Sequence, residues 1–370
     1  MGNFHFGDAT FSQAAPLVIA EIGTGHGGDG ARAADLIAAA AEAGAACAKF
    51  QCVFADEIIH PNTGFVPLPG GPTPLFSVFK ALERDEDFYA ELKRLTEAAG
   101  LVFLCTPFGI RSADLLARIG VGAMKVASPE LNHLPLLRRL ADYRLPTILS
   151  SGVSTLGDIE DALDILEGLP VALLHCVTAY PAPPEDYNLR LLASYAKLFG
   201  VAVGVSDHSL DPVLVPALAV ASGASVVEKH ICLSRDDPGL DDPIALDPEA
   251  FAKMRRAIDE AARDPEGAIE ALNREYGSSL VEATLGSGRK RLAPSEAANY
   301  GLTNRSIHAL VDIEAGHIID ETNSALLRTE KILRPGLEPG EWPRIVGRRA
   351  RQAIPAGEGI RWEDLGNLAE

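Results

Sequence analysis

The sequence lacks several features that define other classes of protein. No apolar run approaches the length of a membrane span, and the N-terminus has no basic segment followed by an apolar one. It also lacks positive charge: the formal net charge is −18, so a phosphate backbone or an anionic membrane would be repelled on average. The sequence therefore predicts a protein that binds neither nucleic acid nor membrane.

Cysteine is scarce and shows no spacing typical of a zinc site. The cysteines are odd in number, and most lie in or beside apolar runs: Cys47, Cys52, Cys105, Cys176 and Cys232. Buried, reduced thiols explain this pattern better than a disulfide framework. We therefore expect a cytoplasmic protein.

What the chain does contain is a regular alternation of short apolar runs and amphipathic helical patterns. Its 370 residues suffice for two domains, or for one large barrel with an appendage. The apolar runs are 17–22, 46–50, 101–106, 122–127, 146–150, 171–176, 201–206 and 225–230. The helical patterns are 31–43, 87–99, 112–119, 134–141, 156–166, 189–199, 212–221 and 248–262. This α/β pattern predicts a (β/α)8 TIM barrel, with an open doubly wound sheet as the alternative.

Ionisable and hydroxyl side chains collect where the apolar runs end. In a TIM barrel the carboxyl ends of the strands meet at one mouth, where active sites are built. The side chains in question are Glu21, Lys49, Gln51, Thr106, Lys125, Ser128, Ser150, Ser151, His175, Tyr180, Ser206, Asp207, His208, Glu228, Lys229 and His230. The sequence therefore predicts one site assembled from every strand.

His208 and His230 follow two neighbouring runs and are candidates for a shared metal site. For either histidine alone, a residue that merely caps its strand is the favoured alternative. The acidic neighbours Asp207 and Glu228 could fix the imidazole tautomers, and the combination favours a metal site.

Lys49 and Lys125 lie within apolar runs, where an unpaired ammonium is costly, so each is expected to face an anion or a carboxylate. With nearby hydroxyl groups they predict a pocket for a phosphorylated or carboxylated substrate. The alternative is that they pair with Glu21 or Glu228 inside the mouth. A Schiff-base role for Lys125 is a third interpretation, less favoured because two histidines nearby point to metal activation of a carbonyl.

The pattern changes after residue 262. Gly286 and Gly288 lie in a stretch typical of a linker, and the sequence Ile-x-Ala-Gly then occurs at 313–316 and again at 354–357. Short strands around glycine turns predict a small β-rich module with internal pseudo-symmetry. We therefore expect a catalytic barrel over residues 1–284, a linker over 285–302 and a β domain over 303–370.

A series of motifs, taken in order, resembles the N-acetylneuraminate (sialic acid) synthase family. They are Ala20-Glu21-Ile22-Gly23, Ala48-Lys49-Phe50-Gln51, Cys105-Thr106-Pro107-Phe108, Lys125-Val126-Ala127-Ser128 followed by Glu130, Ser150-Ser151-Gly152, Leu174-His175-Cys176 with Tyr180-Pro181, Ser206-Asp207-His208, Glu228-Lys229-His230, and Pro238-Gly239 with Asp241. The resemblance runs from about residue 17 to the C-terminus.

The resemblance implies an enzyme that condenses phosphoenolpyruvate with an N-acylated mannosamine-like aldose, giving a nine-carbon 2-keto sugar acid and phosphate. It implies a divalent metal held by His208 and His230, commonly Mn²⁺, with Mg²⁺ and Co²⁺ as alternatives. It implies that Glu21 acts at the reacting centre, that Asp241 contacts sugar hydroxyls and that Tyr180 binds substrate. It further implies a phosphoenolpyruvate site made of Lys49, Thr106, Lys125, Ser128, Ser150 and Ser206.

The C-terminal module is similar to the antifreeze-like (β-clip, SAF) domain of that family. This similarity implies a domain-swapped homodimer in which the module supplies an arginine to the partner's sugar site. Arg328 and Arg334 are the candidates for that arginine, and Arg305 matches another family arginine with a docking role.

The chain departs from the family pattern within the implied site. Gly25 and Gly27 replace two asparagines, Pro129 replaces a glycine, and Asp242 stands where histidine is common. We therefore predict an aldose other than N-acetylmannosamine, such as a 6-deoxy diacetamido hexose of the legionaminate or pseudaminate type. The alternatives are a non-catalytic carbohydrate-binding or assembly homologue, and a 3-deoxy-aldulosonate synthase that takes a phosphorylated aldose.

Overall fold

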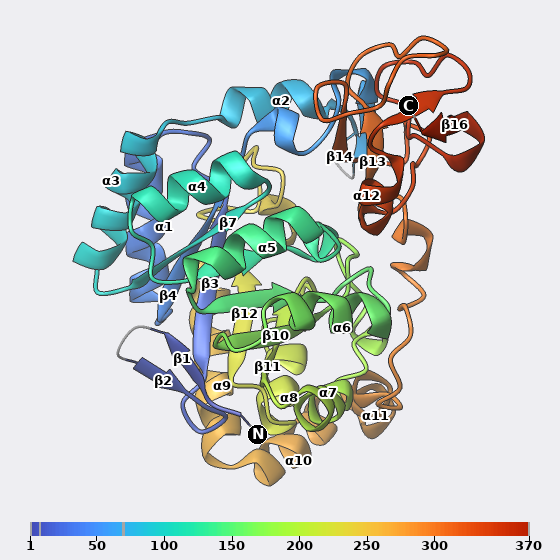
Figure 1. Cartoon of the computed structure of the whole chain (residues 1–370). Coiled ribbons are helices and arrows are strands. Elements are labelled where there is room, and N and C mark those ends of the chain that lie inside the picture. The colour runs from blue at the N-terminus through green and yellow to red at the C-terminus, as the bar shows by residue number, and fades with distance from the viewer. Residues whose placement is uncertain (1, 7–8, 69–70, 369–370) are drawn as a thin grey trace.

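The chain builds a ring of parallel strands with a smaller domain beside it (Figure 1). The computed structural model describes residues 2–6, 9–68 and 71–368. The strands of the ring are β3 (Leu17–Gly23), β4 (Cys47–Cys52), β7 (Val102–Pro107), β8 (Met124–Val126), β9 (Thr147–Ser150), β10 (Val171–Cys176), β11 (Ala202–Asp207) and β12 (Val226–His230). They pair in parallel in the order β7-β4-β3-β12-β11-β10-β9-β8. Because β7 and β8 also pack together, the sheet is nearly closed, and the predicted TIM barrel is confirmed over an open sheet.

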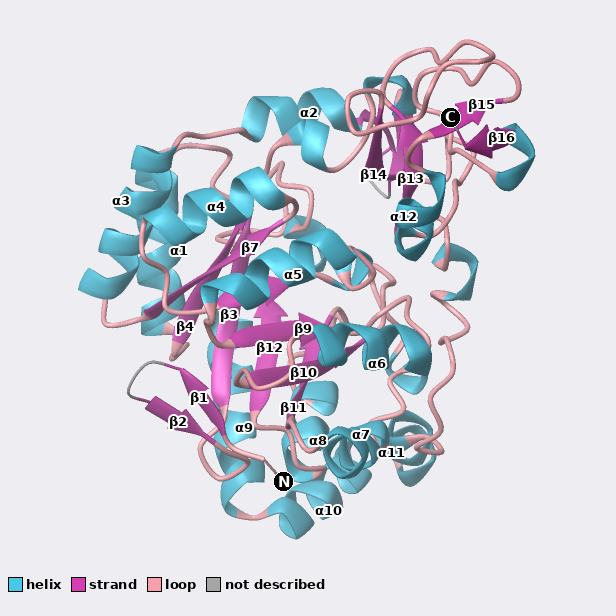
Figure 2. Ribbon diagram, in the orientation of Figure 1, coloured by secondary structure: helices cyan, strands magenta, loops and turns pink. Residues whose placement is uncertain are grey.

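Helices alternate with these strands and cover the outside of the ring (Figure 2). They are α1 (Gly30–Glu42), α3 (Glu86–Ala98), α4 (Ile110–Arg118), α5 (Leu134–Tyr143), α6 (Leu156–Ile165), α7 (Leu191–Phe199), α8 (Leu214–Ala221) and α9 (Pro248–Arg263). Their ends carry ordinary signals: the Asp29 side chain caps α1, and Gly200 ends α7 in the left-handed conformation. None of the helices in the described residues is long and apolar enough to cross a membrane.

The inside of the barrel is filled by alternate residues of the strands, because successive side chains of a strand point to opposite faces. Leu17 and Ile19 of β3 point inward, whereas Val18 and Ala20 pack against the helices. One end of this inner core is covered by a hairpin, β1 (Phe4–Phe6) and β2 (Ala9–Phe11), through its three phenylalanines. The sequence analysis missed this hairpin because three-residue strands are too short to show a period.

Several further elements lie outside the repeating units. The β4–β7 connection contains η1 (Ala55–Glu57), η2 (Pro61–Thr63), β5 (Phe65–Leu68), β6 (Gly71–Pro74) and α2 (Leu75–Leu82). After α9 the chain forms α10 (Pro265–Tyr276) and α11 (Ser278–Leu285), of which α10 packs against α8 and α9. Residues 286–304 then contain only the short helix η6 (Ala297–Asn299).

The C-terminal domain has its own small core and lies near α2 in Figure 1. It consists of β13 (Arg305–Ala309), β14 (Ser324–Arg328), α12 (Trp342–Ile345), β15 (Arg348–Ala350) and β16 (Leu365–Leu368). The two Ile-x-Ala-Gly copies meet, since Ile313 and Ile354 exchange backbone hydrogen bonds of 2.9 and 2.8 Å. Gly316 and Gly357 adopt φ of 87° and 89°, which favours glycine at both turns.

Candidate active site

Most of the predicted side chains face one cavity of about 190 Å³ at the carboxyl ends of the strands. The alternation that packs the inner core also selects them: Glu21 continues the inward series of Leu17 and Ile19, and Glu228 and His230 continue that of Val226. The predicted residues that line the cavity are Glu21, Lys49, Lys125, Ser128, Ser150, Tyr180, Ser206, His208, His230, Asp241 and Arg328. Thr106 and Arg334 are not among the lining residues.

Both buried lysines are paired in this structure. Lys49 Nζ lies 2.8 Å from Glu21 Oε2 and 3.5 Å from Glu228 Oε2, and it donates to Thr106 Oγ1 at 3.4 Å. Lys125 Nζ donates to Ser150 Oγ at 2.6 Å and lies 3.8 Å from Glu228 Oε1. The alternative in which the lysines meet carboxylates inside the mouth is therefore observed. Thr106 acts on the cavity through Lys49.

Glu228 is the central carboxylate of the site. It accepts a hydrogen bond from Ser206 Oγ at 2.9 Å and lies between the two ammonium groups. Burial alone would raise its pKa, but Lys125 and Lys49 outweigh burial and lower the pKa of Glu228 to about 2. Burial lowers the pKa of Lys49, but the carboxylates of Glu21 and Glu228 outweigh burial and raise it, whereas burial leaves the pKa of Lys125 lowered. The two lysines of the mouth are therefore paired with carboxylates before any substrate binds.

His208 and His230 lie side by side, with ring centroids 5.7 Å apart and planes at 50°. His208 Nδ1 lies 2.9 Å from the Val177 carbonyl oxygen. Because a carbonyl only accepts, Nδ1 carries a proton and Nε2 is left for a ligand. Burial lowers the pKa of His230, which keeps a lone pair available on its imidazole. Two neighbouring imidazoles of this kind fit a divalent metal such as Mn²⁺.

Two further side chains lie next to this histidine pair. Cys176 Sγ lies 3.8 Å from His208 Nδ1, and Asp241 Oδ2 lies 3.9 Å from His230 Nδ1. Burial lowers the pKa of His208, but Cys176, with the Val177 carbonyl, reverses this and raises the pKa. Among the described residues, no group of three or more His, Cys, Asp or Glu side chains is placed to hold a metal ion. The remaining positions on the metal would be open to substrates.

The prediction that Asp207 and Glu228 fix the tautomers of the two histidines is wrong. Asp207 and Lys229 point to the outer face of the barrel, where they form an ion pair of 2.5 Å, because each is one residue away from an inward-facing position. Glu228 is engaged by the lysines and Ser206. The tautomer of His208 is fixed by a backbone carbonyl instead. His175 likewise points outward, against Tyr195 of α7.

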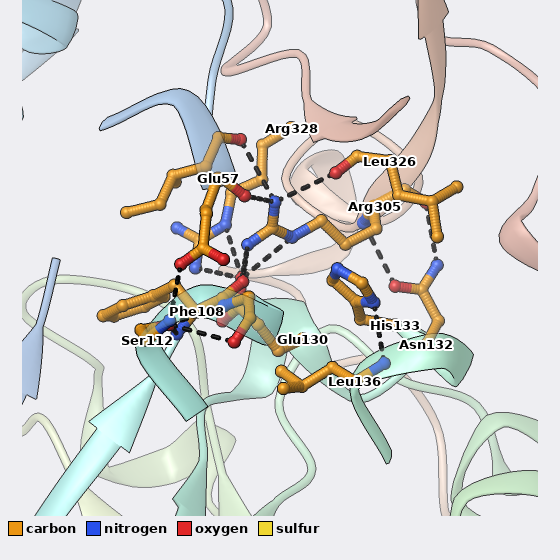
Figure 3. Close-up of polar contacts among 12 residues, drawn as sticks. Glu57, Phe108, Ser112, Glu130, Asn132, His133, Leu136, Arg305, Leu326 and Arg328 are labelled. Carbon is orange, nitrogen blue, oxygen red and sulfur yellow. Dashed lines mark hydrogen bonds and ion pairs between the residues drawn. The ribbon is translucent and has the colours of Figure 1, made fainter. Parts of the chain in front are cut away.

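The C-terminal domain brings Arg328 to the cavity of its own chain (Figure 3). Its guanidinium contacts Glu130 Oε1 through Nε at 2.9 Å and Nη2 at 2.5 Å. Arg305, fully buried beside it, contacts the same oxygen at 2.9 and 3.1 Å and donates to the carbonyls of Glu57, Phe108 and Leu326. Arg305 thus docks the domain onto the barrel.

Arg334 does not reach the cavity, contrary to its place among the candidates. Its guanidinium donates to the Gly359 carbonyl at 2.7 Å and pairs with Asp364 at 2.7 Å. Both partners belong to the C-terminal domain, so Arg334 stabilises that domain internally.

The departures from the family pattern lie after three strands of the ring: Gly25 and Gly27 after β3, Asp242 after β12 and Pro129 after β8. A Cβ at Gly25 would lie 3.1 Å from the Ile22 carbonyl and 3.4 Å from Asp242 Oδ1, so Asp242 occupies the space next to the missing side chain. Asp242 is buried and accepts from the Gly239 N–H at 2.8 Å. Gly27 adopts φ of 59° with open space around it, and Pro129 lines the cavity.

Sequence analysis placed Gln51 and Glu228 at the mouth, and it assigned no role to two further groups of residues. Gln51 donates to Glu21 Oε1 at 2.8 Å, and Glu228 lies within ion-pair distance of both lysines. Glu130, which holds both arginines, follows Ser128 closely but gave no signal of its own. An apolar wall is formed by side chains brought in by loops and α2, which no period connects: Val53, Ile58, Phe79, Phe108 and Leu240.

A second cavity, of about 210 Å³, lies where the C-terminal domain meets the barrel. Its lining includes Asn132, Asp158, Tyr300 and Glu338. None of the residues predicted for catalysis or metal binding lines it in the described part of the chain, so the first cavity is the candidate site.

Fold and site together define a TIM-barrel protein whose lysine-lined mouth is completed by a small C-terminal β domain. The sequence model of the NeuB family matches residues 36–268, and that of the SAF domain matches residues 304–366. The chain belongs to the NeuB family.

Similar proteins extend over the whole chain. The spore coat polysaccharide biosynthesis protein SpsE of Bacillus subtilis is 34% identical over 377 residues, covering 99% of this chain and 98% of that protein. Its crystal structure superimposes with a TM-score of 0.81 and covers all of both chains. The N,N'-diacetyllegionaminic acid synthase of Legionella pneumophila is 32% identical and covers 94% of each chain. The structure of the sialic acid synthetase of Leptospira borgpetersenii is 29% identical, with a TM-score of 0.65, covering 80% of this chain and 95% of that one.

Proposed function

We propose that this protein is a phosphoenolpyruvate-dependent nonulosonate synthase. It joins phosphoenolpyruvate to an N-acylated mannosamine-like aldose, giving a nine-carbon 2-keto sugar acid and phosphate. The observation that carries this proposal is the convergence of two buried lysines, a histidine pair and Arg328 on one cavity. Membership of the NeuB family and the synthase names of its relatives support it.

The lysine side of the cavity is suited to phosphoenolpyruvate. Lys49 and Lys125 are fixed by carboxylates and hydroxyls before substrate arrives, so little reorganisation is needed when an anion binds. Ser128 and Ser206 add hydroxyl groups on the same side. Holding both substrates at one mouth removes much of the entropic barrier of a bimolecular step.

His208 and His230 would hold the divalent metal, Mn²⁺ by preference. When bound, it supplies Lewis-acid polarisation of the aldose carbonyl oxygen. Glu21 lies beside both the lysine side and the histidine pair, and its two oxygens are oriented by Gln51 and Lys49. We assign it to orienting or deprotonating the water that adds to C2 of the enol substrate.

The apolar part of the cavity lining suits an aldose that carries methyl groups better than a phosphorylated aldose. Phe79, Phe108 and Leu240 offer surface to methyl groups, such as those of N-acetyl substituents or a 6-deoxy carbon. The guanidinium on this side, Arg328, is already held by Glu130. Asp241 would repel a sugar phosphate and accept hydrogen bonds from hydroxyl groups. These features favour a modified hexose of the legionaminate or pseudaminate type.

A homodimer is part of the proposal. Large apolar side chains are exposed on and near the C-terminal domain, namely Phe65 at 65%, Val311 at 52% and Ile332 at 45%. Exposed apolar residues of this kind mark surfaces that a second subunit can cover. An exchange of C-terminal domains between subunits would keep the contact of Arg328 with Glu130, with the two residues coming from different chains.

The test uses the purified protein with Mn²⁺, phosphoenolpyruvate and a panel of aldoses. The panel contains N-acetylmannosamine, its 6-phosphate and diacetamido-trideoxyhexoses, and the measurements are phosphate release and 2-keto acid formation. We expect the trideoxyhexoses to give the highest kcat/KM, and the His208→Ala and His230→Ala variants to be inactive.

The other outcomes identify the alternatives. Robust turnover of N-acetylmannosamine alone contradicts the aldose assignment. Preference for the phosphorylated sugar favours an aldulosonate-type synthase. No phosphate release with any sugar leaves a carbohydrate-binding or assembly homologue.

A further inference from the structure

The segment between the two domains, residues 286–304, is bound along the barrel. The side chains of Ala293, Glu296 and Asn304 are buried although the segment has almost no regular structure. Lys290 Nζ donates to the Ser151 carbonyl at 3.3 Å, and Asn304 Nδ2 donates to the Val153 carbonyl at 3.0 Å. A simple tether would leave such polar groups in water. Residues 286–304 therefore bind to the barrel in addition to connecting it to the C-terminal domain.

The Glu296 carboxylate is the centre of these contacts. It is 1% exposed, and its Oε2 accepts from the backbone N–H of Val153 at 2.9 Å and of Thr178 at 2.8 Å. Its Oε1 accepts from the Ala293 N–H at 3.2 Å. Hydrogen bonds to a charged acceptor are among the stronger ones in proteins. One side chain thus joins the loop after β9 to the loop after β10.

The loop after β10 leads directly to the histidine pair. The N–H of Thr178 and the C=O of Val177 belong to the same peptide group. Glu296 binds that N–H, and His208 Nδ1 donates to that C=O at 2.9 Å. Because a peptide group is planar, fixing one end fixes the direction of the other. Glu296 therefore sets the direction of the carbonyl that orients the His208 imidazole.

The loop after β9 shows why such a restraint is needed. Val153 adopts φ of 42°, a left-handed conformation that is strained for a β-branched residue. Strain of this kind persists only where surrounding contacts enforce it. Here the Val153 N–H is bound by Glu296 and its C=O by Asn304. The adjacent Gly152 N–H donates to Ser128 Oγ at 3.0 Å, so this loop also borders the cavity.

We propose that Glu296, in the segment between the domains, is a positioning residue for the metal-binding pair, acting through the Val177–Thr178 peptide group on His208. The inference rests on the proposed function, since it concerns how the metal site of that enzyme is held. It makes the interdomain segment part of the active-site framework.

The experiment measures Mn²⁺ binding by electron paramagnetic resonance titration without substrates, beside kcat/KM and melting temperature. In Glu296→Gln the side chain keeps its shape but loses its charge, and one of its terminal atoms becomes a donor facing backbone donors. We expect the Mn²⁺ dissociation constant to rise about tenfold, as is typical when a group that orients a metal ligand is changed. Asn299→Ala removes the bond of 2.9 Å to the Thr178 carbonyl and should act in the same direction.

The matched control is Arg190→Met. Arg190 binds the Gly286 carbonyl at 2.5 Å, so its loss loosens the start of the same segment without touching Thr178. This control should leave Mn²⁺ affinity unchanged. If Glu296→Gln and Asn299→Ala bind Mn²⁺ like the wild type, the inference is overturned while the proposed function stands, and lower melting temperatures would then show a purely structural role. If Glu296→Gln fails to fold, Asn299→Ala decides. A wild-type chain that binds no Mn²⁺ overturns both.

Discussion

Lys49 is a single residue on which the buried ion pairs of the site depend. Its ammonium is almost fully buried and lies within ion-pair distance of both Glu21 and Glu228. The pairs place one ammonium between two carboxylates in the barrel mouth, at a position where desolvation is severe. Removing the lysine would take an ion-pair partner from both carboxylates.

We therefore expect Lys49→Met to lower the free energy of unfolding by about 3 kcal/mol or more. It should also abolish phosphate release, because the anion pocket loses a permanent cation. Urea unfolding followed by circular dichroism measures the first effect. Lys80→Met is the control, since Lys80 is exposed and its pair with Glu83 at the surface should contribute little to stability. Equal stability of the two variants would contradict the buried pairing.

Arg328 and Arg334, the two candidate arginines, should respond differently to substitution. Arg328→Ala should raise the KM for the aldose by about tenfold or more, because a charged hydrogen-bonding group is lost from the cavity. Arg334→Ala should leave the KM unchanged and lower the melting temperature, because Arg334 binds only inside its own domain. Steady-state kinetics with both variants provides the test. A KM effect confined to Arg334→Ala would show that the arginines have been assigned the wrong way round.

At the scale of elements, α5 begins beneath the buried arginines. Its cap is His133, whose Nδ1 accepts from the Leu136 N–H at 3.2 Å. Burial, with Arg305 next, lowers the pKa of His133 from 6.5 to about 3. The folded protein therefore keeps this ring neutral in mild acid, whereas the unfolded chain protonates it below pH 6.5.

The free energy of unfolding should therefore decrease as the pH is lowered from about 6.5 to 3. The decrease should be about 1.4 kcal/mol per pH unit for this residue alone. His133→Asn keeps a good cap but removes the titration, so its stability should fall less steeply over that range. Both proteins should have similar pH dependence above pH 7, where the ring is neutral in both states. Urea unfolding as a function of pH measures the slopes, and identical slopes in acid would refute the assignment.

The N-terminal hairpin is a second element with a separable role. Phe4 is 1% exposed and packs on the inner core away from the active-site mouth. We expect Phe4→Ala to cost about 3 kcal/mol through the cavity it leaves. At a temperature where the variant is folded, its kcat/KM should equal that of the wild type. A large kinetic effect would mean that the two ends of the barrel are coupled.

At the scale of the whole molecule, the remaining question is which chain completes each mouth. Arg328→Ala and His208→Ala can be mixed after unfolding and refolded together. If the C-terminal domains are exchanged, a mixed dimer has one site with both wild-type residues, and at an aldose concentration far below the KM we expect activity to recover to about a quarter of the wild-type value. No recovery would show that each barrel uses its own domain. Each variant refolded alone is the control.

Much of the architecture is accessible from the sequence because the barrel repeats one simple pattern. All eight apolar runs contain strands, and each helical pattern contains a helix, because an apolar period has to match its element for the core to be buried. The short hairpin β1–β2 and the excursion after β4 carry no such period and were missed. The roles of the individual site residues stay predictions.

What the sequence determined by itself was the ring of strands and the set of side chains at its mouth, since a period of two fixes which residues point inward. What only the tertiary structure decided was how those side chains pair. The lysines meet Glu21 and Glu228, Arg328 rather than Arg334 reaches the cavity, and Glu296 fixes the peptide group beside His208. These contacts join residues far apart in the chain. No local pattern encodes such distances, because they depend on how the strands, loops and C-terminal domain close around one another.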